Sequence, residues 1–339
     1  MRQYIELAEQ SIHLTESEMI EAGRLMFDHE TNQEDIQRFL LALKEKGETS
    51  DEISGLVMAV KEIAGSYETT AENIIDNCGT GGDGSQSFNI STCAAFVIAG
   101  AGIPVAKHGN RSISSKTGSA DVLEHLGVRL DFNKEEAKEL LEKYQITFLF
   151  APHVHSGIKN VMKARKALGV PTIFNLIGPL TNPVNLSSQM IGIYRRDMIH
   201  TMALAMKKTG RKRGVVLNGA GHMDEASLAG TNYLALLEGD EINEFTLHPE
   251  ELGLSVIPNE EIKGGDSKEN AEILLSVLSG EDSVYRQTVV LNAGIALFAS
   301  GKVKSIRDGI TEAEKSIDSK SALDKLNKLI DFSKKKAVV

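Results

Sequence analysis

Residues 77–84 read Asn77-Cys78-Gly79-Thr80-Gly81-Gly82-Asp83-Gly84, and they join a predicted strand over 73–76 to an apolar helical pattern over 92–100. Glycines let the backbone turn tightly, so that several N–H groups can face one anion. The start of the following helix adds further N–H donors and a favourable dipole. We therefore predict that this strand–loop–helix junction binds phosphate.

The same junction has a plainer interpretation. A glycine cluster alone is more often a turn in which Ser91 or Thr92 merely caps the helix. No Gly-Lys-Ser/Thr follows, so the segment is not a Walker loop, and it is not a clean dinucleotide fingerprint either. Ser87 and Asn89 add short polar groups suited to phosphate and sugar oxygens, which favours the binding interpretation.

The alternation of strands and helices beyond residue 72 predicts the fold class. Strands are expected at 73–76, 104–106, 146–150, 190–194 and 214–217, and helices at 92–100, 119–126, 134–144 and 197–208. This order predicts an α/β fold with a largely parallel sheet that has helices on both faces. Ligands of such sheets bind beyond the carboxyl ends of the strands.

The first 65 residues read as helices only. Three capping boxes predict helix starts, and Gly47 and Gly65 stand where two of these helices should stop. The boxes are Thr15/Glu18, Thr31/Glu34 and Thr49/Glu52. We expect a small helical domain over 1–70, joined by a returning segment near 165–185, and an α/β domain over 71–339 that ends in further helices, including 283–299 and 319–333.

A second loop, residues 107–119, combines cations, hydroxyls and glycines between a strand and a helix. Its basic residues are Lys107, His108, Arg111 and Lys116. Such a loop predicts a second anion site, although a flexible polar loop is the plainer alternative. Two phosphate loops on successive strands suggest a ligand with two phosphate-bearing ends.

Asp224 and Glu225 follow the strand that is expected at 214–217. Adjacent carboxylates in a loop suit Mg²⁺, which takes one or two protein carboxylates and leaves other positions to phosphate and water. Taken alone, such a pair is usually surface charge. Its expected place opposite two phosphate loops makes it a candidate metal anchor.

Composition excludes several classes. The 339 residues are 41% hydrophobic and carry a formal charge of −10, which argues against a nucleic-acid binder. No apolar run is long enough to span a bilayer, so no membrane partner is expected. Cys78 and Cys93 show neither metal-ligand spacing nor a disulfide framework, which fits a reducing cytoplasm.

Taken together, these motifs closely resemble the anthranilate phosphoribosyltransferase family over nearly the whole chain. The matching stretches are 79–84, Asn89-Ile90-Ser91-Thr92, 107–116, 118–124 and Thr172-Ile173-Phe174-Asn175. The resemblance implies transfer of the phosphoribosyl group of phosphoribosyl pyrophosphate (PRPP) to the amine of anthranilate in tryptophan biosynthesis. It also implies a homodimer formed through the helical domain.

The resemblance further implies a role for individual residues. Those that would hold the donor PRPP are Gly79, Gly82, Asp83, Ser87, Asn89, Ile90, Ser91, Thr92, Lys107, Ser115 and Ser119. Those that would meet anthranilate are Gly79, His108, Asn110, His155 and Arg165. Ser91, Asp224 and Glu225 would bind Mg²⁺, and no residue is expected to act as a discrete acid or base.

The sequence departs from the family pattern at three places. Ser87 replaces the usual Thr but keeps the hydroxyl. His155-Ser156-Gly157-Ile158-Lys159 stands where His-Pro-Ala-Met-Lys is usual, and Pro171 stands where Arg is common. The last two departures concern the acceptor side of the expected site.

Two other functions remain open at this stage. A pyrimidine nucleoside phosphorylase shares the implied architecture, although the phosphate-loop sequence motif of that family is not found here. A non-catalytic relative that binds nucleic acid would show eroded loops and a basic surface, and the sequence shows neither.

Overall fold

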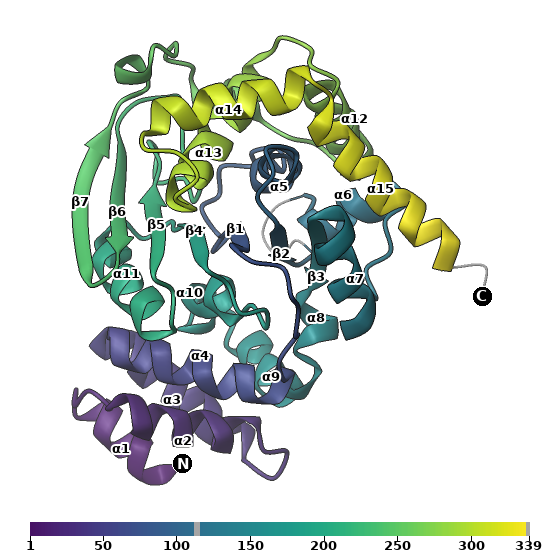
Figure 1. Cartoon of the computed structure of the whole chain (residues 1–339). Coiled ribbons are helices and arrows are strands. Elements are labelled where there is room, and N and C mark those ends of the chain that lie inside the picture. Colours follow the sequence, from purple (N-terminus) through teal and green to yellow (C-terminus); the bar gives the residue numbers. More distant parts are fainter. Residues whose placement is uncertain (112–115, 337–339) are drawn as a thin grey trace.

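The computed structural model describes residues 1–111 and 116–336, and it begins with a bundle of four helices (Figure 1). These helices are α1 (Arg2–Glu9), α2 (Glu16–Phe27), α3 (Gln33–Lys46) and α4 (Ser50–Ala64). The capping boxes at Thr15 and Thr49 are confirmed, and Gly47 and Gly65 end α3 and α4 as expected.

The capping box predicted at Thr31 is wrong. Asn32 is the N-cap of α3, because its side-chain oxygen accepts from the Glu34 N–H at 3.0 Å. The Thr31 hydroxyl donates instead to the Leu25 carbonyl at 2.6 Å, which satisfies the end of the preceding helix. Asn is as good an N-cap as Thr, so the start of α3 moves by one residue.

A seven-stranded sheet forms the centre of the chain, in the order β3-β2-β1-β4-β5-β6-β7. Its strands are β1 (Ile75–Gly79), β2 (Val105–Gly109), β3 (Ile146–Phe150), β4 (Ser188–Gly192), β5 (Arg213–Asn218), β6 (Asn232–Glu238) and β7 (Glu241–Leu247). The first five are parallel to their neighbours, which confirms the predicted fold class. The last two add an antiparallel edge.

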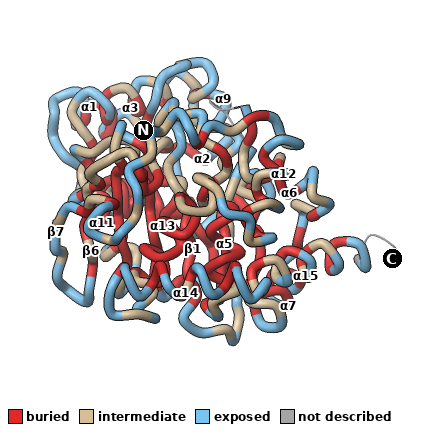
Figure 2. The backbone as a smooth tube through the Cα atoms, turned by 90° about the horizontal axis from the view of Figure 1, so that it is seen from above, coloured by how far each residue is buried: buried red, intermediate tan, exposed pale blue. Residues whose placement is uncertain are grey.

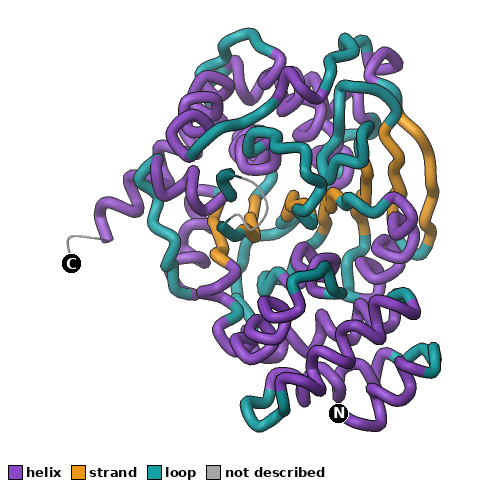
Figure 3. Tube along the Cα trace, turned by 180° about the vertical axis from the view of Figure 1, so that it is seen from behind, coloured by secondary structure: helices purple, strands orange, loops and turns teal. Residues whose placement is uncertain are grey.

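Alternate side chains of the strands enter two different cores. Val215 and Leu217 of β5 join one apolar cluster, whereas Val216 between them joins the other. The first core lies under α5, α6, α12, α13, α14 and α15; the second lies under the bundle and α9, α10 and α11. Figure 2 shows the buried strands at the centre, and Figure 3 shows the sheet between two layers of helices.

The helices of the first layer are α5 (Ile90–Gly100), α6 (Ser119–His125), α12 (Ser267–Leu278), α13 (Val284–Ala299), α14 (Ile306–Asp318) and α15 (Ser321–Lys336). Those on the bundle side are α9 (Lys159–Leu168), α10 (Phe174–Ile177) and α11 (Ile199–Lys208). Near the β3 edge lie α7 (Lys134–Tyr144) and α8 (Ala151–Val154). Among the described residues, no helix is long and apolar enough to cross a membrane.

The segment from α9 to the turn at Gly178–Thr181 packs against the N-terminal bundle. Val161, Phe174 and Leu180 belong to the same apolar cluster as α2, α3 and α4. Asn160 strengthens this contact, because its side chain donates to the Asp28 carbonyl at 2.8 Å. The chain thus returns to the helical region after β3 and then re-enters the sheet at β4.

Candidate active site

The parallel strands bring five loops to one edge of the sheet. Gly79 of β1 pairs with Gly192 of β4, Gly109 of β2 pairs with Phe150 of β3, and Gly192 pairs with Leu217 of β5. The carboxyl ends of these strands are therefore level with one another. Every predicted site segment leaves the sheet at this edge, where ligands of parallel sheets bind.

The glycine loop is in direct contact with Asp224. The Gly81 N–H donates to Asp224 Oδ2 at 2.6 Å. A Cβ at position 79 would lie 2.2 Å from that oxygen, and one at position 192 would lie 1.6 Å from the Asp224 carbonyl oxygen. Only glycine permits these approaches, so two strand ends are shaped to fit one aspartate.

Three carboxylates meet beside this contact. Asp83 Oδ2 accepts from the Asp224 N–H at 3.3 Å, and Glu225 is next to Asp224 in the chain. Burial, followed by the charges of Asp83 and Glu225, raises the pKa of Asp224 well above its usual range. Burial also raises the pKa of Glu225 to about 7, against the opposing effect of Lys107. Carboxylates crowded in this way favour a cation among them.

Lys107 and the start of α5 close the other side of this cluster. Lys107 is 3% exposed, and its Nζ donates to the Asn77 carbonyl at 3.2 Å and to Ser91 Oγ at 3.3 Å. The Ser91 N–H donates to Glu225 Oε1 at 3.1 Å, and Asn77 Nδ2 donates to the Ser91 carbonyl at 2.9 Å. Ser91 thus contacts both the carboxylate and the ammonium group.

Two buried polar atoms near Ser91 have no protein partner within the described residues: Asn77 Oδ1 and Thr92 Oγ1. Such atoms are uncommon in native structures and call for a water or a ligand. The Ile90 side chain, in contrast, is 1% exposed and belongs to the apolar core, and its N–H donates to the Phe88 carbonyl at 2.7 Å.

The outer part of the glycine loop rests on a distant segment. Phe88 N–H donates to the Ile262 carbonyl at 3.1 Å, and Gly264 N–H donates to the Gln86 carbonyl at 2.9 Å. Asn270 Nδ2 donates to Asn89 Oδ1 at 2.9 Å. Ser85 Oγ donates to Asp83 Oδ1 at 3.0 Å and lies 3.3 Å from Ser87 Oγ, so the hydroxyl retained at position 87 is part of this network.

The expectation of four cations in the second loop needs correction. Burial, and then the neighbouring His155, lowers the pKa of His108 to about 3, so His108 is neutral. Arg111 is paired with Asp121 at 2.7 Å and Glu124 at 2.9 Å. Its charge is therefore balanced locally.

The rest of the second loop is placed as follows. Lys107 is aimed into the site, and Lys116 is exposed. Ser119 Oγ donates to the Asn110 carbonyl at 3.2 Å, which joins the two ends of the loop. The predicted donor residue Ser115 lies outside the described residues.

His108 and His155 form a buried pair at the acceptor side. Their Nε2 atoms are 3.2 Å apart, their rings meet edge to face, and each residue is 5% exposed. Burial lowers the pKa of His155 to about 4, so both rings are neutral near pH 7. Within the described residues, His155 Nδ1 is buried without a hydrogen-bond partner.

Arg165 extends from α9 and is held on two sides. Its guanidinium lies 5.3 Å from the centroid of the Phe174 ring and donates to Asn175 Oδ1 at 3.2 Å. Burial lowers its pKa from the usual value, yet Arg keeps its charge at any physiological pH. Among the described residues no carboxylate pairs with it at ion-pair distance. An anionic ligand group would supply that partner.

The two acceptor-side departures have different structural settings. A Cβ at Gly157 would lie 2.1 Å from Ile63 Cγ2, so the usual Ala could not fit beside this Ile without movement. The small residue after His155 therefore matches a large residue on α4. Pro171 is exposed and lies just before Thr172, whose N–H donates to Asn175 Oδ1 at 3.0 Å.

Several residues of the site were not predicted. Asn270 supports Asn89 from 181 positions away, and Asp76 accepts from the His108 N–H at 3.2 Å and from Asn182 Nδ2 at 3.0 Å. The Tyr194 ring lies 3.9 Å from the position of a Cβ at Gly82. Only Gly192 carried a local signal, because a glycine at the end of a strand often marks a close backbone approach.

Among the described residues, no three His, Cys, Asp or Glu side chains form a closed metal cage. This arrangement fits Mg²⁺, which is commonly bound through one or two carboxylates together with phosphate and water. The raised pKa values of Asp224 and Glu225 and the orphan oxygens near Ser91 agree with a cation and an anion that share this edge.

Comparison with known proteins first defines the class. The model of the helical bundle domain of the glycosyl transferase family matches residues 2–64, and the model of the a/b domain of that family matches residues 71–323. The two parts of the chain are therefore those of a glycosyl transferase. More particularly, the chain belongs to the anthranilate phosphoribosyltransferase family.

Both sequence and structure support this membership. The chain is 58% identical to the anthranilate phosphoribosyltransferase of Exiguobacterium sibiricum over 96% of both chains, and 56% identical to that of Bacillus cereus over 98% of both. The enzyme from Thermus thermophilus superposes with a TM-score of 0.91 at 36% identity, covering 98% of this chain and 99% of that one. The enzyme from Saccharomyces cerevisiae, in complex with PRPP and Mg, gives a TM-score of 0.87 at 28% identity, covering 95% and 94%.

Proposed function

We propose that this protein transfers the phosphoribosyl group of PRPP to the amine of anthranilate, giving N-(5-phosphoribosyl)anthranilate and pyrophosphate in tryptophan biosynthesis. One observation carries the proposal: the glycine loop donates to Asp224 at the sheet edge where Lys107 reaches Ser91. An anion cradle and a metal-type carboxylate pair are thus parts of one site. Relatives that are 56% and 58% identical to this chain carry the same activity in their names.

The donor half of the site would bind PRPP and Mg²⁺. The glycine loop, the start of α5 and Lys107 supply N–H and ammonium donors for phosphate oxygens. Ser91, Asp224 and Glu225 would hold Mg²⁺, as their contacts and raised carboxylate pKa values favour. When bound there, Mg²⁺ would neutralise negative charge on the departing pyrophosphate.

The acceptor half would bind and orient anthranilate. Arg165, which pairs with no carboxylate among the described residues, suits the anthranilate carboxylate. Asn110 and the His108–His155 pair would line the position of the ring and amine. An aromatic amine is neutral at pH 7, so the reaction needs no strong general base. Positioning of the amine against the ribose C1 carbon would supply most of the acceleration.

The arrangement of the whole protein belongs to the same proposal. We propose a helical domain over 1–70, completed by the returning segment near 165–185, and an α/β domain over 71–339. The packing of α9 and α10 on the bundle supports this division. We also propose a cytoplasmic homodimer formed through the helical domain, which size-exclusion chromatography with light scattering would test.

The decisive experiment follows the loss of anthranilate fluorescence when enzyme, PRPP and Mg²⁺ are mixed. We expect turnover that needs all three components and that stops when EDTA is added. Turnover of a pyrimidine nucleoside with phosphate, but not of anthranilate, would replace the proposal with the phosphorylase alternative. Tight binding of nucleic acid without turnover would favour the non-catalytic alternative.

A further inference from the structure

Three consecutive residues after β4 contact three different parts of the molecule. Tyr194, Arg195 and Arg196 leave the sheet beside the glycine loop, and we call them the β4 junction. Tyr194 lies close to the glycine loop. Arg195 donates a hydrogen bond to the helical bundle, and Arg196 donates one to the strand that leads to the carboxylate pair.

The first contact of the β4 junction is with the donor loop. The Thr80 N–H donates to the carbonyl of Gly192, two residues before Tyr194, at 2.9 Å. The Tyr194 ring lies 3.9 Å from the position that a Cβ at Gly82 would take. Gly82 has a φ of +81°, so the backbone here adopts a conformation that glycine favours. The end of β4 is therefore tied to the glycine loop through the backbone, and Tyr194 lies close to that loop.

The second contact is with the segment that precedes Asp224. Arg196 Nε donates to Asn218 Oδ1 at 2.9 Å, and Asn218 Nδ2 donates to the Ile193 carbonyl at 2.7 Å. Asn218 is fully buried, and its amide also donates to the Met223 carbonyl at 3.4 Å. The junction and the carboxylate loop are therefore tied through one side chain.

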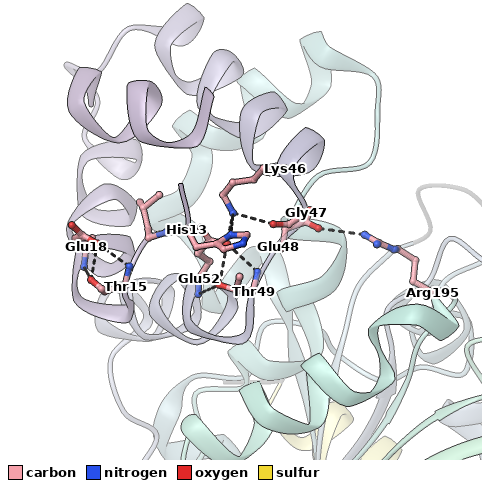
Figure 4. A network of polar contacts seen from close by, with 10 residues as sticks. His13, Thr15, Glu18, Lys46, Gly47, Glu48, Thr49, Glu52 and Arg195 are labelled. Carbon is pink, nitrogen blue, oxygen red and sulfur yellow. Dashed lines mark hydrogen bonds and ion pairs between the residues drawn. The ribbon is translucent and has the colours of Figure 1, made fainter. Parts of the chain in front are cut away.

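The third contact reaches the helical bundle. Arg195 donates to Glu48, in the turn between α3 and α4, with an N–O distance of 3.3 Å. The Glu48 side chain is 3% exposed, whereas that of Arg195 is 34% exposed and also pairs with Asp197 at 2.6 Å. Figure 4 shows Arg195 extending toward the turn that carries Glu48.

That turn is held firmly from inside the bundle. Lys46 Nζ contacts Glu52 Oε2 at 2.6 Å, the Gly47 carbonyl at 3.0 Å and His13 Nδ1 at 3.1 Å (Figure 4). The side chains of Lys46 and Glu52 are 1% and 0% exposed. Glu52 also accepts from the Leu14 N–H and from the N-cap Thr49. The turn is therefore a rigid support for Glu48.

We propose that Arg195 is a positioning residue that, through its ion pair with Glu48, lets the helical bundle hold the donor loop in its PRPP-binding conformation. The inference rests on the proposed function. The bundle would act on Arg195, and the adjoining Tyr194 and Arg196 would pass the constraint to the glycine loop and to the carboxylate loop.

The burial of Glu48 gives this contact its strength. A buried carboxylate that loses its partner must take up a proton or regain water, and both outcomes loosen its surroundings. Burial already raises the pKa of Glu48, and Arg195 opposes that rise. Removal of the Arg195 charge should therefore open the contact between the α3–α4 turn and the β4 junction.

The test measures PRPP affinity separately from turnover. Arg195→Met keeps the side-chain stem and removes the charge; we expect the Kd for PRPP with Mg²⁺, measured by calorimetry, and the KM for PRPP each to rise about tenfold, equivalent to roughly 1.4 kcal/mol. The KM for anthranilate should stay within about twofold, and Arg195→Lys should restore most of the affinity.

A matched control breaks another ion pair between the bundle and the α/β part. Lys208 of α11 pairs with Asp51 of α4 at 2.7 Å, and it lies just before the start of β5, whereas the carboxylate loop follows the other end of that strand. Lys208→Met should leave the Kd for PRPP unchanged. A similar loss of PRPP affinity in both variants would overturn the proposal, because it would indicate general loosening of the bundle.

The remaining outcomes also decide the matter. An Arg195→Met protein that binds PRPP like the wild type would overturn the proposal. If Arg195→Met does not fold, Glu48→Gln replaces it in the test. We expect its Kd for PRPP to rise about threefold, equivalent to roughly 0.7 kcal/mol. An unchanged Kd in Glu48→Gln would also overturn the proposal. A wild-type protein that binds no PRPP would instead refute the proposed function itself.

Discussion

The proposed donor and acceptor halves of the candidate site are built by different means. On the donor side, backbone N–H groups and glycines bring short loops against Asp224, and the charges of Lys107, Asp224 and Glu225 lie within one hydrogen-bonded group. On the acceptor side, a neutral histidine pair and Arg165, held by Phe174 and Asn175, are placed by α8, α9 and their packing on the bundle.

This difference teaches where specificity and chemistry are encoded. The donor side depends on residues that allow backbones to approach, and few substitutions can preserve such contacts. The acceptor side depends on packing between distant helices, where one change can be matched by another, as Gly157 matches Ile63. Two of the three departures from the family pattern, at 155–159 and at Pro171, also lie on the acceptor side.

The largest effect is expected from the carboxylate pair. Asp224→Ala combined with Glu225→Ala removes both proposed Mg²⁺ ligands, so turnover should fall by about 10³-fold or more. Stopped-time assays with saturating PRPP and anthranilate would measure this loss, and circular dichroism would check the fold. Near-normal turnover in Mg²⁺ would contradict this contrast between the two halves, because the donor side would then not depend on a metal bound by Asp224 and Glu225.

The next effect is steric. A methyl group at Gly79 would lie 2.2 Å from Asp224 Oδ2 and 2.8 Å from its backbone oxygen, so Gly79→Ala must push the two loops apart. A displacement of about 1 Å can cost about 10²-fold in rate, and we expect such a fall in kcat/KM for PRPP. An unchanged kcat/KM with an unchanged Tm would show that the close approach is not required.

Much of the fold could be predicted because local signals agree with the global pattern. The helix over 134–144 and the strand over 146–150 were predicted to the residue, since Asn133 and Glu136 form a capping box and an apolar run follows. The ends of β1 and β4 were misplaced by two or three residues. Whether a polar residue at the end of a strand belongs to that strand depends on its hydrogen bonds to the neighbouring strands. The local sequence does not reveal these partners.

The hairpin of β6 and β7 was not predicted, although a signal existed. Gly239-Asp240 separates the two strands and Gly239 has a φ of +62°, as a two-residue hairpin turn requires. Within the site, the glycine loop could be predicted from the sequence, whereas the neutral charge state of His108 could not. Its pKa is lowered by burial between segments that are remote in the chain.

Substitution of Arg165 tests directly whether the acceptor side binds anthranilate. Arg165→Ala should raise the KM for anthranilate roughly 10- to 100-fold, because a charged hydrogen bond to its carboxylate is lost. The KM for PRPP should stay nearly unchanged, and Arg165→Lys should recover part of the loss. Equal increases in both KM values would contradict the separation of the site into donor and acceptor halves.

The charge of Glu225 offers a smaller, thermodynamic test. Its pKa is about 7 in the metal-free fold and 4.5 as the reference value, so the folded state binds the extra proton. Its contribution to stability is therefore present below pH 4.5 and lost as the pH rises through about 7. Glu225→Gln should melt roughly 5 °C above the metal-free wild type at pH 8, with a narrower gap at pH 5.

Magnesium provides the control for that measurement. Added Mg²⁺ should raise the Tm of the wild type at pH 8, because it stabilises the ionised carboxylate, and it should have little effect on Glu225→Gln. Equal Mg²⁺ effects on both proteins would move the metal away from Glu225. The donor side would then differ from the acceptor side by its glycines alone.

The smallest effect concerns the histidine pair, whose charge behaves in the opposite sense. The pKa of His155 is about 4 in the fold and 6.5 as the reference value, so the unfolded chain binds the proton more readily. Its contribution to stability is present above pH 6.5 and lost as the pH falls toward 4. At pH 5 the stability that has been lost amounts to on the order of 2 kcal/mol.

His155→Gln, whose amide nitrogen can replace Nε2 beside His108, should therefore show a drop in Tm from pH 8 to pH 5 that is roughly 4 °C smaller than that of the wild type. An equal drop in both proteins would mean that His155 takes up its proton without unfolding, and the acceptor side would then be charged rather than neutral at pH 5.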